Sequence, residues 1–262
     1  MRRYLKWKLM LKTLPIVAAV LAIDYIVDLK LKEGFVDFTD LGPILTAGAF
    51  LIGFMLAGTI ADYKEAEKLP GEIACTLETI EESLAVASSK KDLDLPAAQT
   101  KLFAMISAVS DVLARRAKLA DAYAAMNAFS AIAHEMDKTG AGSMATRTLG
   151  EMHNLRKAIT RVDVIARTSF IDSGYALVDF IVFAVVVLML VARFKTLLVE
   201  YVLIGFITLI YTYMINLIRD VDNPFDYDRD GYPKGAADVD PHLVYDYRDR
   251  ARARLLGPQA GS

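Results

Sequence analysis

Few residues in this chain have types and spacings that could do chemistry. His134 and Glu135 start like the zinc-binding helix of a metalloprotease, but the position four residues after His134 is Lys138 instead of a second histidine. His153 and His242 are isolated in the sequence. The sequence contains no glycine-rich phosphate loop, nucleophile elbow or cysteine cluster. We therefore expect no catalytic residues and no cofactor, and we favour a protein that is not an enzyme.

A run of acidic residues near the C-terminus is a second candidate for chemistry. Hard cations prefer such a density of oxygen ligands, and the stretch 226–231 follows the start of a calcium-binding loop. The twelfth position of that loop should be a bidentate glutamate, but it is Ala237. A solvated acidic turn is the favoured interpretation, and a cation site or a contact between subunits is the alternative. The candidate residues are Asp222, Asp226, Asp228 and Asp230.

Three further carboxylates lie within apolar stretches, where charges are unfavourable and are usually paired or functional. These are Asp24, Asp179 and Glu200, and each is near the end of its stretch. We expect them at the membrane interface, within reach of water. The alternative is that Asp24 or Asp179 faces a wet vestibule.

The composition is that of a membrane protein with a sizeable soluble part. Of 262 residues, 55% are hydrophobic and 24% are charged, and the mean hydropathy is +0.34. The net charge of −2 does not favour nucleic acid as a partner. The single cysteine, Cys75, cannot form an internal disulfide, and we expect it to be a small buried hydrophobe.

Four apolar spans are long enough to cross a bilayer or nearly so: 13–27, 43–60, 174–192 and 197–217. Five Lys and Arg residues precede the first span and predict a cytoplasmic N-terminus. We expect an N-terminal membrane hairpin at 1–61, a cytosolic helical region at 62–173, a C-terminal membrane hairpin at 174–218 and a cytosolic tail at 219–262. Both termini are then cytoplasmic.

The second span differs from a helix that faces lipid alone. It is rich in Gly and Ala, which suggests close contact between helices. Thr46, Phe50 and Phe54 follow one another at four-residue spacing, so they form a stripe on one helix face. We interpret this span as the inner helix of an oligomeric pore with an apolar constriction.

The soluble segments have different patterns. The region 65–167 shows apolar stripes at helical spacing, typical of a packed helical core, with breaks near Pro96 and at 139–143, where Ser143 is a fair helix cap. The tail from Asp220 has no periodicity, but its aromatic residues indicate that it docks on a surface, and a short helix is expected at about 241–255. The aromatic residues are Phe225, Tyr227, Tyr232 and Tyr245.

Two separated segments resemble the bestrophin family of ion channels. Phe50-Leu51-Ile52-Gly53-Phe54, followed after an apolar turn by the charged run 62–71, resembles the F-x-x-G-F neck of that family and the aromatic and charged run after it. The segment 222–228, DNPFDYD, resembles the N/D-P-F motif and acidic run that follow the last span of bestrophins. The run 62–71 departs from the family pattern at Asp62, Tyr63, Lys64, Glu67 and Pro70.

This resemblance implies an all-α integral membrane protein with four transmembrane helices per subunit and a cytosolic helical region. It implies a homopentamer with one axial pore, a neck at Thr46, Phe50 and Phe54, and a tail that wraps a neighbouring subunit. Ile165 and Phe170 are candidates for the cytosolic exit. The expected partners are membrane lipid, further copies of the chain and inorganic ions, in a bacterial inner membrane.

Two function classes compete. The favoured one is an oligomeric ion channel gated at a hydrophobic neck. The alternative is a non-conducting membrane scaffold or sensor that binds a cytosolic partner through its helical region. They differ in whether the large side chains of the second span face an axis or a closed, packed core.

Overall fold

The described residues form helices apart from one short strand pair and the connecting loops, and the chain divides into two compact units. We describe the protein from a computed structural model, for residues 2–30, 34–89, 93–168, 172–228, 231, 233–235 and 237–257. The first unit comprises Met1–Tyr63, Ser169–Asn223 and Gly235–Ala237. The second comprises Lys64–Thr168, Pro224–Lys234 and Asp238–Ser262.

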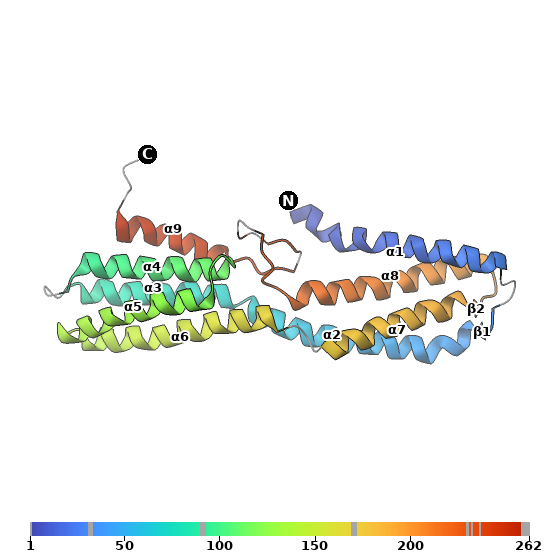
Figure 1. Ribbon diagram of the computed structural model, residues 1–262, viewed down its shortest axis with the longest axis horizontal. Coiled ribbons are helices and arrows are strands. Elements are labelled where there is room, and N and C mark those ends of the chain that lie inside the picture. Colours follow the sequence, from blue (N-terminus) through green and yellow to red (C-terminus); the bar gives the residue numbers. More distant parts are fainter. Residues whose placement is uncertain are drawn as a thin grey trace. The chain divides into compact units, whose positions relative to one another are not determined.

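The first unit is built from long apolar helices (Figure 1). These are α1 (Arg2–Lys30), α2 (Gly42–Ala66), α7 (Asp172–Leu190) and α8 (Leu197–Asp222), of which α2 continues into the second unit. The described residues include four stretches that are long and apolar enough to cross a membrane: Trp7–Leu29, Phe38–Ala87, Ser173–Leu190 and Leu197–Asp222. They confirm the four predicted spans, and the second stretch also runs on into α3.

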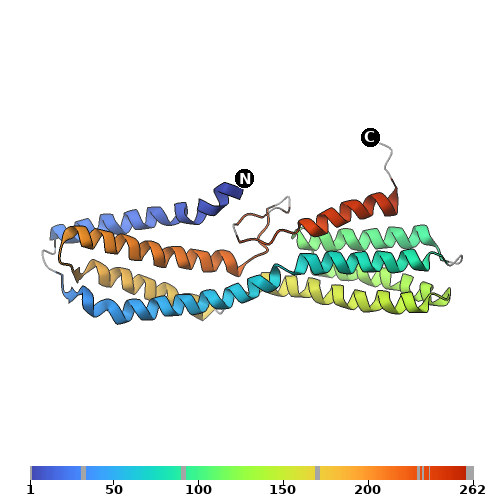
Figure 2. The ribbon, with the colours of Figure 1, turned by 180° about the vertical axis from the view of Figure 1, so that it is seen from behind.

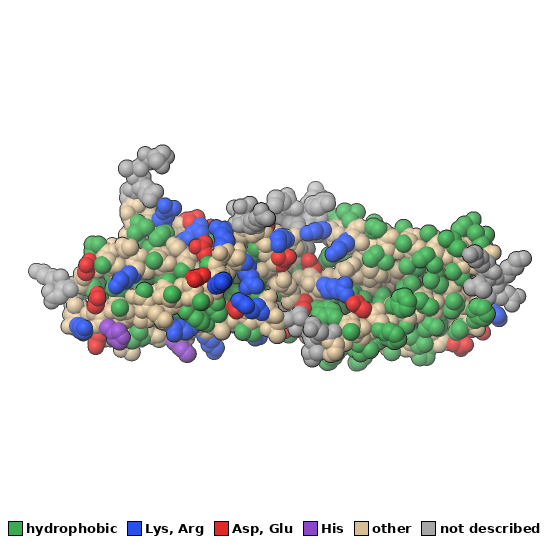
Figure 3. Space-filling view, in the orientation of Figure 1, with side chains coloured by type: hydrophobic (Ala, Val, Ile, Leu, Met, Phe, Trp, Pro, Cys, Tyr) green, Lys and Arg blue, Asp and Glu red, His purple; other side chains and the backbone are tan. Residues whose placement is uncertain are grey.

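Hydrophobic side chains cover much of the outside of this unit. In the most apolar windows of the four stretches, only 11 to 28% of the residues are buried within the chain. The face seen in Figure 3 shows hydrophobic side chains gathered over α1, α7 and α8, whereas charged side chains gather over the helices of the second unit. Lipid or further copies of the chain must cover so much apolar surface, so this is a membrane protein.

The buried side chains of the first unit come from all four of its helices. Ile52 and Met55 of α2 pack in the same cluster as Val185 of α7 and Ile204 of α8. On the outside, Arg219 of α8 donates to both carboxylate oxygens of Asp179 of α7, at 2.8 and 2.7 Å. This agrees with the expectation that Asp179 lies within reach of water.

A short strand pair ties the two hairpin connections together. β1 (Val36–Asp37) pairs in parallel with β2 (Ala192–Arg193), with Val36 opposite Ala192. The 3-10 helix η1 (Phe38–Leu41) follows β1, and the ring of Phe38 lies 5.1 Å from that of Phe194. Strands of two residues have no detectable period, so the sequence does not predict them.

The second unit is a bundle of amphipathic helices. They are α3 (Leu69–Ala87), α4 (Leu95–Leu113), α5 (Leu119–Lys138), α6 (Gly142–Arg167) and α9 (His242–Leu256). α3 packs mainly against α6, and α9 lies along α3 and α4, as both ribbon views show (Figures 1 and 2). The short helix expected at about 241–255 is therefore confirmed as α9.

The predicted apolar stripes form the core of this bundle, with corrections at single residues. Leu77, Leu102 and Phe129 are fully buried. Leu149 is exposed, and so is Cys75, which was expected to be buried, because each lies on the solvent side of its helix. Ser143 is not a cap, since α6 begins at Gly142, one residue before it.

Candidate functional site

The second membrane helix, α2, carries the predicted neck. Pro43 is its second residue, where the missing N–H costs no helical hydrogen bond. From Gly42 to Ala61 the helix has no charged residue, and charge begins at Asp62. The apolar segment belongs to the first unit, and the residues of this helix from Lys64 onward belong to the second.

One face of α2 packs within its own chain. Gly48, Ile52, Met55 and Thr59 are buried at spacings of three and four residues. Gly48 allows the closest approach: a Cβ added there would lie 3.0 Å from Cε1 of Tyr211. The hydroxyl of Tyr211 also donates to the carbonyl oxygen of Leu45. Gly48 and the hydrogen bond from Tyr211 hold α2 against α8. They fix which face of α2 points away from the rest of its chain.

The opposite face of α2 is open. Phe50 and Phe54 are 76% and 66% exposed in the single chain, and Thr46 is also exposed. The hydroxyl of Thr46 donates to the carbonyl oxygen of Gly42 at 2.9 Å, so it is bonded to its own helix. A Cβ added at Gly53 would meet no atom within 4 Å. The three predicted neck residues therefore share one face, which the chain itself does not cover.

The two glycines on opposite faces of α2 make a testable pair. We expect Gly48→Leu to lower the free energy of unfolding by about 1–3 kcal/mol, because the new side chain must displace Tyr211 and Ile181 in a packed core. Gly53→Leu should cause no such loss, because its surroundings within the chain are open. Thermal unfolding in detergent, followed by circular dichroism, measures both. Equal losses at the two positions would contradict this assignment of the faces.

Of the two predicted cytosolic-exit residues, the structure describes Ile165. Ile165 is buried, at 6% exposure, near the end of α6 in the second unit. Phe170 lies outside the described residues.

The tail acids are placed in different settings. Asp222 ends α8 in the first unit, Asp226 and Asp228 belong to the second, and Asp230 lies outside the described residues. Nζ of Lys234 lies 2.8 Å from a carboxylate oxygen of Asp226. Where the chain is described, no group of three acids close enough to share a metal ion includes a tail residue.

Two of the four predicted tail aromatics dock on their own chain, and Tyr232 lies outside the described residues. Phe225 and Tyr227 are buried, and the Tyr227 hydroxyl donates to the carbonyl oxygen of Val239 at 2.8 Å.

Tyr247 of α9 is fully buried and its hydroxyl contacts Oε2 of Glu81 at 2.7 Å. Burial, followed by this hydrogen bond, raises the pKa of Tyr247, so the phenol remains protonated. Arg254 pairs with both oxygens of Glu81, each at 2.8 Å.

The expectation for Asp24 was wrong. This residue was expected at the membrane interface within reach of water, but its side chain is fully buried between helices of the first unit. The sequence signal was its distance of one helical turn from Asp28, which places both carboxylates on the same side of α1.

No protein-family model matches the sequence, and the comparison with curated proteins gives no match either. Solved structures do match. A bacterial bestrophin homologue from Klebsiella pneumoniae, solved by Zn-SAD phasing, superposes with a TM-score of 0.73 at 13% identity, covering 97% of this chain and 98% of the other. A variant of the Klebsiella pneumoniae homologue with a tyrosine-to-alanine substitution gives 0.71 at 13% identity, over 97% and 100%.

A second variant, with a leucine-to-threonine substitution, gives a TM-score of 0.71 at 13% identity over 97% of this chain and 99% of the other. These matches run over nearly the whole length of both chains, and they agree with the resemblance carried by the segments 50–71 and 222–228. The chain has the bestrophin fold.

Proposed function

We propose that this chain is a subunit of an oligomeric ion channel whose axial pore is lined by α2. The observation that carries the proposal is the exposed face of α2 with Phe50 and Phe54, opposite a face that is packed within the chain. The fold supports it, because bestrophin homologues are ion channels. An open phenylalanine face on a helix of this fold is accounted for if copies of that face surround an axis.

The proposed neck works by wetting and drying. Rings of Phe54 and Phe50 narrow the pore with apolar side chains, which cannot replace the water around an ion. Ions pass when the rings separate enough for water to remain continuous through the neck. Thr46 lies on the same stripe, four residues before Phe50, and its hydroxyl is hydrogen-bonded to the backbone of α2.

The finer assignments follow from the same proposal. The assembly is a homopentamer in a bacterial inner membrane with both termini on the cytoplasmic side, in line with the basic residues before the first span. Phe170 is the candidate for the cytosolic exit, since Ile165 is buried within its own chain. The tail, with Asp222, Asp226, Asp228 and Asp230, provides contacts between subunits or holds a cation.

Two measurements on the purified protein test the proposal. Native mass spectrometry in detergent should give the mass of the proposed homopentamer. Vesicles containing the protein should release ions faster than protein-free vesicles, with separate anion and cation dyes reporting which ions pass. An oligomer that releases neither kind of ion would favour the non-conducting scaffold instead.

A further inference from the structure

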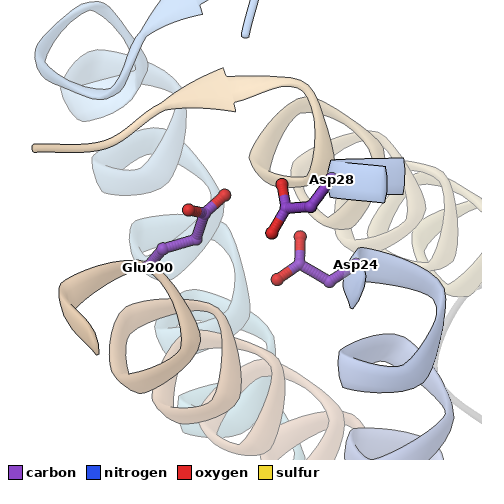
Figure 4. A group of neighbouring side chains, drawn as sticks. All are labelled: Asp24, Asp28 and Glu200. Atoms are coloured by element: carbon purple, nitrogen blue, oxygen red, sulfur yellow. The ribbon is translucent and has the colours of Figure 1, made fainter. Parts of the chain in front are cut away.

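Three carboxylates from two helices of the first unit converge on one point. Asp24 and Asp28 lie one turn apart on α1, and Glu200 lies in the first turn of α8. Their side chains point toward one another (Figure 4), and one oxygen from each lies within 4.8 Å of the others.

Asp24 distinguishes this cluster from an ordinary group of acids on a protein surface. Its side chain has 0% exposure, and neither carboxylate oxygen has a hydrogen-bond partner among the described residues. The ion pairs found where the chain is described involve none of the three acids. A hydrogen bond to the cluster comes from Tyr201, whose hydroxyl donates to Oδ2 of Asp28 at 3.3 Å. A buried carboxylate with like charges beside it is strongly unfavourable unless something compensates it.

We propose that Asp24, Asp28 and Glu200 bind a divalent cation of the size of Ca²⁺ or Mn²⁺ and thereby tie α1 to α8. Carboxylate oxygens are the ligands that these ions prefer, and three carboxylates can supply up to six of them. The three oxygens lie within 4.8 Å of one another, so small rotations of the side chains are enough to close them on one ion. Ca²⁺ binds oxygen at about 2.3–2.6 Å in flexible geometry, whereas Mg²⁺ needs a tighter octahedron at about 2.0–2.1 Å, so this cluster suits Ca²⁺ better than Mg²⁺.

An ion can reach the cluster from the end of the unit. A cavity of about 620 Å³ is lined by Asp28 and Glu200 together with residues of the two hairpin connections, among them Gly34, Phe35 and Arg193. The guanidinium of Arg193 is bonded to the carbonyl oxygen of Gly34 at 3.1 Å. The cavity wall thus holds two of the three carboxylates beside the basic Arg193 and Lys195, and Asp24 lies next to those two carboxylates. This proposal does not rest on the proposed channel function.

Electron paramagnetic resonance of Mn²⁺ tests the site in the purified full chain after treatment with a chelator. We expect the wild type to bind Mn²⁺, and we expect Ca²⁺ to displace it more readily than Mg²⁺. Asp24→Asn and Glu200→Gln keep the size of each side chain and remove its charge, and each should lower the number of bound Mn²⁺ ions by one per chain.

A control variant separates this site from other acids. Asp40→Asn removes an exposed carboxylate of η1, which is part of the same unit. It should bind as many Mn²⁺ ions as the wild type. Unchanged Mn²⁺ binding in both Asp24→Asn and Glu200→Gln, or an absence of Mn²⁺ binding by the wild type, would overturn the proposal.

A second readout does not depend on counting ions. Without divalent cations, Asp24→Asn should unfold at the same or a higher Tm than the wild type, because it removes an uncompensated buried charge. Addition of Ca²⁺ should raise the Tm of the wild type and leave that of Asp24→Asn unchanged. Equal Ca²⁺ shifts in both proteins would also overturn the proposal, even if one variant were poorly folded in the binding assay.

Discussion

Phe54→Ala should raise ion flux through reconstituted vesicles by about tenfold or more. Removing the ring of Phe54 side chains widens the narrowest apolar part of the proposed pore and lowers the barrier to wetting. A barrier lower by about 1.4 kcal/mol already corresponds to a tenfold faster rate. The measurement is the initial rate of dye quenching at equal protein density, with native mass spectrometry to show that the oligomer persists.

The chain provides a matched control for this experiment. Phe183 of α7 is 67% exposed, against 66% for Phe54, and both belong to membrane helices of the first unit. Phe183→Ala should leave the flux unchanged, because the proposal places α2 alone at the axis. Equal effects of the two substitutions, or an unchanged flux in a Phe54→Ala protein that still assembles, would contradict the assignment of the neck.

Tyr247→Ala should lower the free energy of unfolding of the second unit by about 3–5 kcal/mol, as for other large buried aromatic side chains. Tyr247 is fully buried where α9 meets α3, and its hydroxyl contacts the carbonyl oxygen of Leu77 as well as Glu81. Tyr247→Phe keeps the ring and removes only the hydroxyl, and Glu81 keeps its pair with Arg254, so we expect a smaller loss of about 0.5–1.5 kcal/mol. Denaturant unfolding of the full chain, followed by circular dichroism, measures both.

Leu256→Ala is the comparison for that loss. Leu256 lies at the end of the same helix and is 45% exposed, so its truncation should change stability by less than about 0.5 kcal/mol. If Tyr247→Ala were as mild as Leu256→Ala, the docking of α9 on α3 and α4 would contribute little to the stability of this chain.

The features that the sequence predicts well are those with a local signal. Length and hydropathy identify the membrane helices because nothing else needs a long run without charge. The spacing of Thr46, Phe50 and Phe54 predicts a common face because helix geometry repeats every three to four residues, and the structure shows that face exposed. Leu77, Leu102 and Phe129 follow the same logic in the helical region.

The features that the sequence does not predict depend on which distant segments meet. Nothing local indicates that the end of α1 faces the start of α8, so the sequence predicts Asp24 and Glu200 only as separate interface charges. Cys75 was expected to be buried from its residue type, but the buried face of α3 is set by Ile73, Leu77 and Ile80. Similarly, the sequence predicts α9 as a helix. It does not predict that Tyr247 and Arg254 dock this helix on α3, because that depends on where Glu81 lies in space.

Disulfide cross-linking at position 54 tests most directly whether the open face of α2 surrounds an axis. The exposed Cys75 is first replaced by Ser, and Phe54→Cys or Phe183→Cys is then introduced. In a ring of subunits, identical residues meet one another only near the axis, because the contacts between neighbours join different surfaces. We predict oxidised dimers for Phe54→Cys and none for Phe183→Cys. Dimers at position 183 without dimers at position 54, or no oligomer to cross-link, would contradict the account.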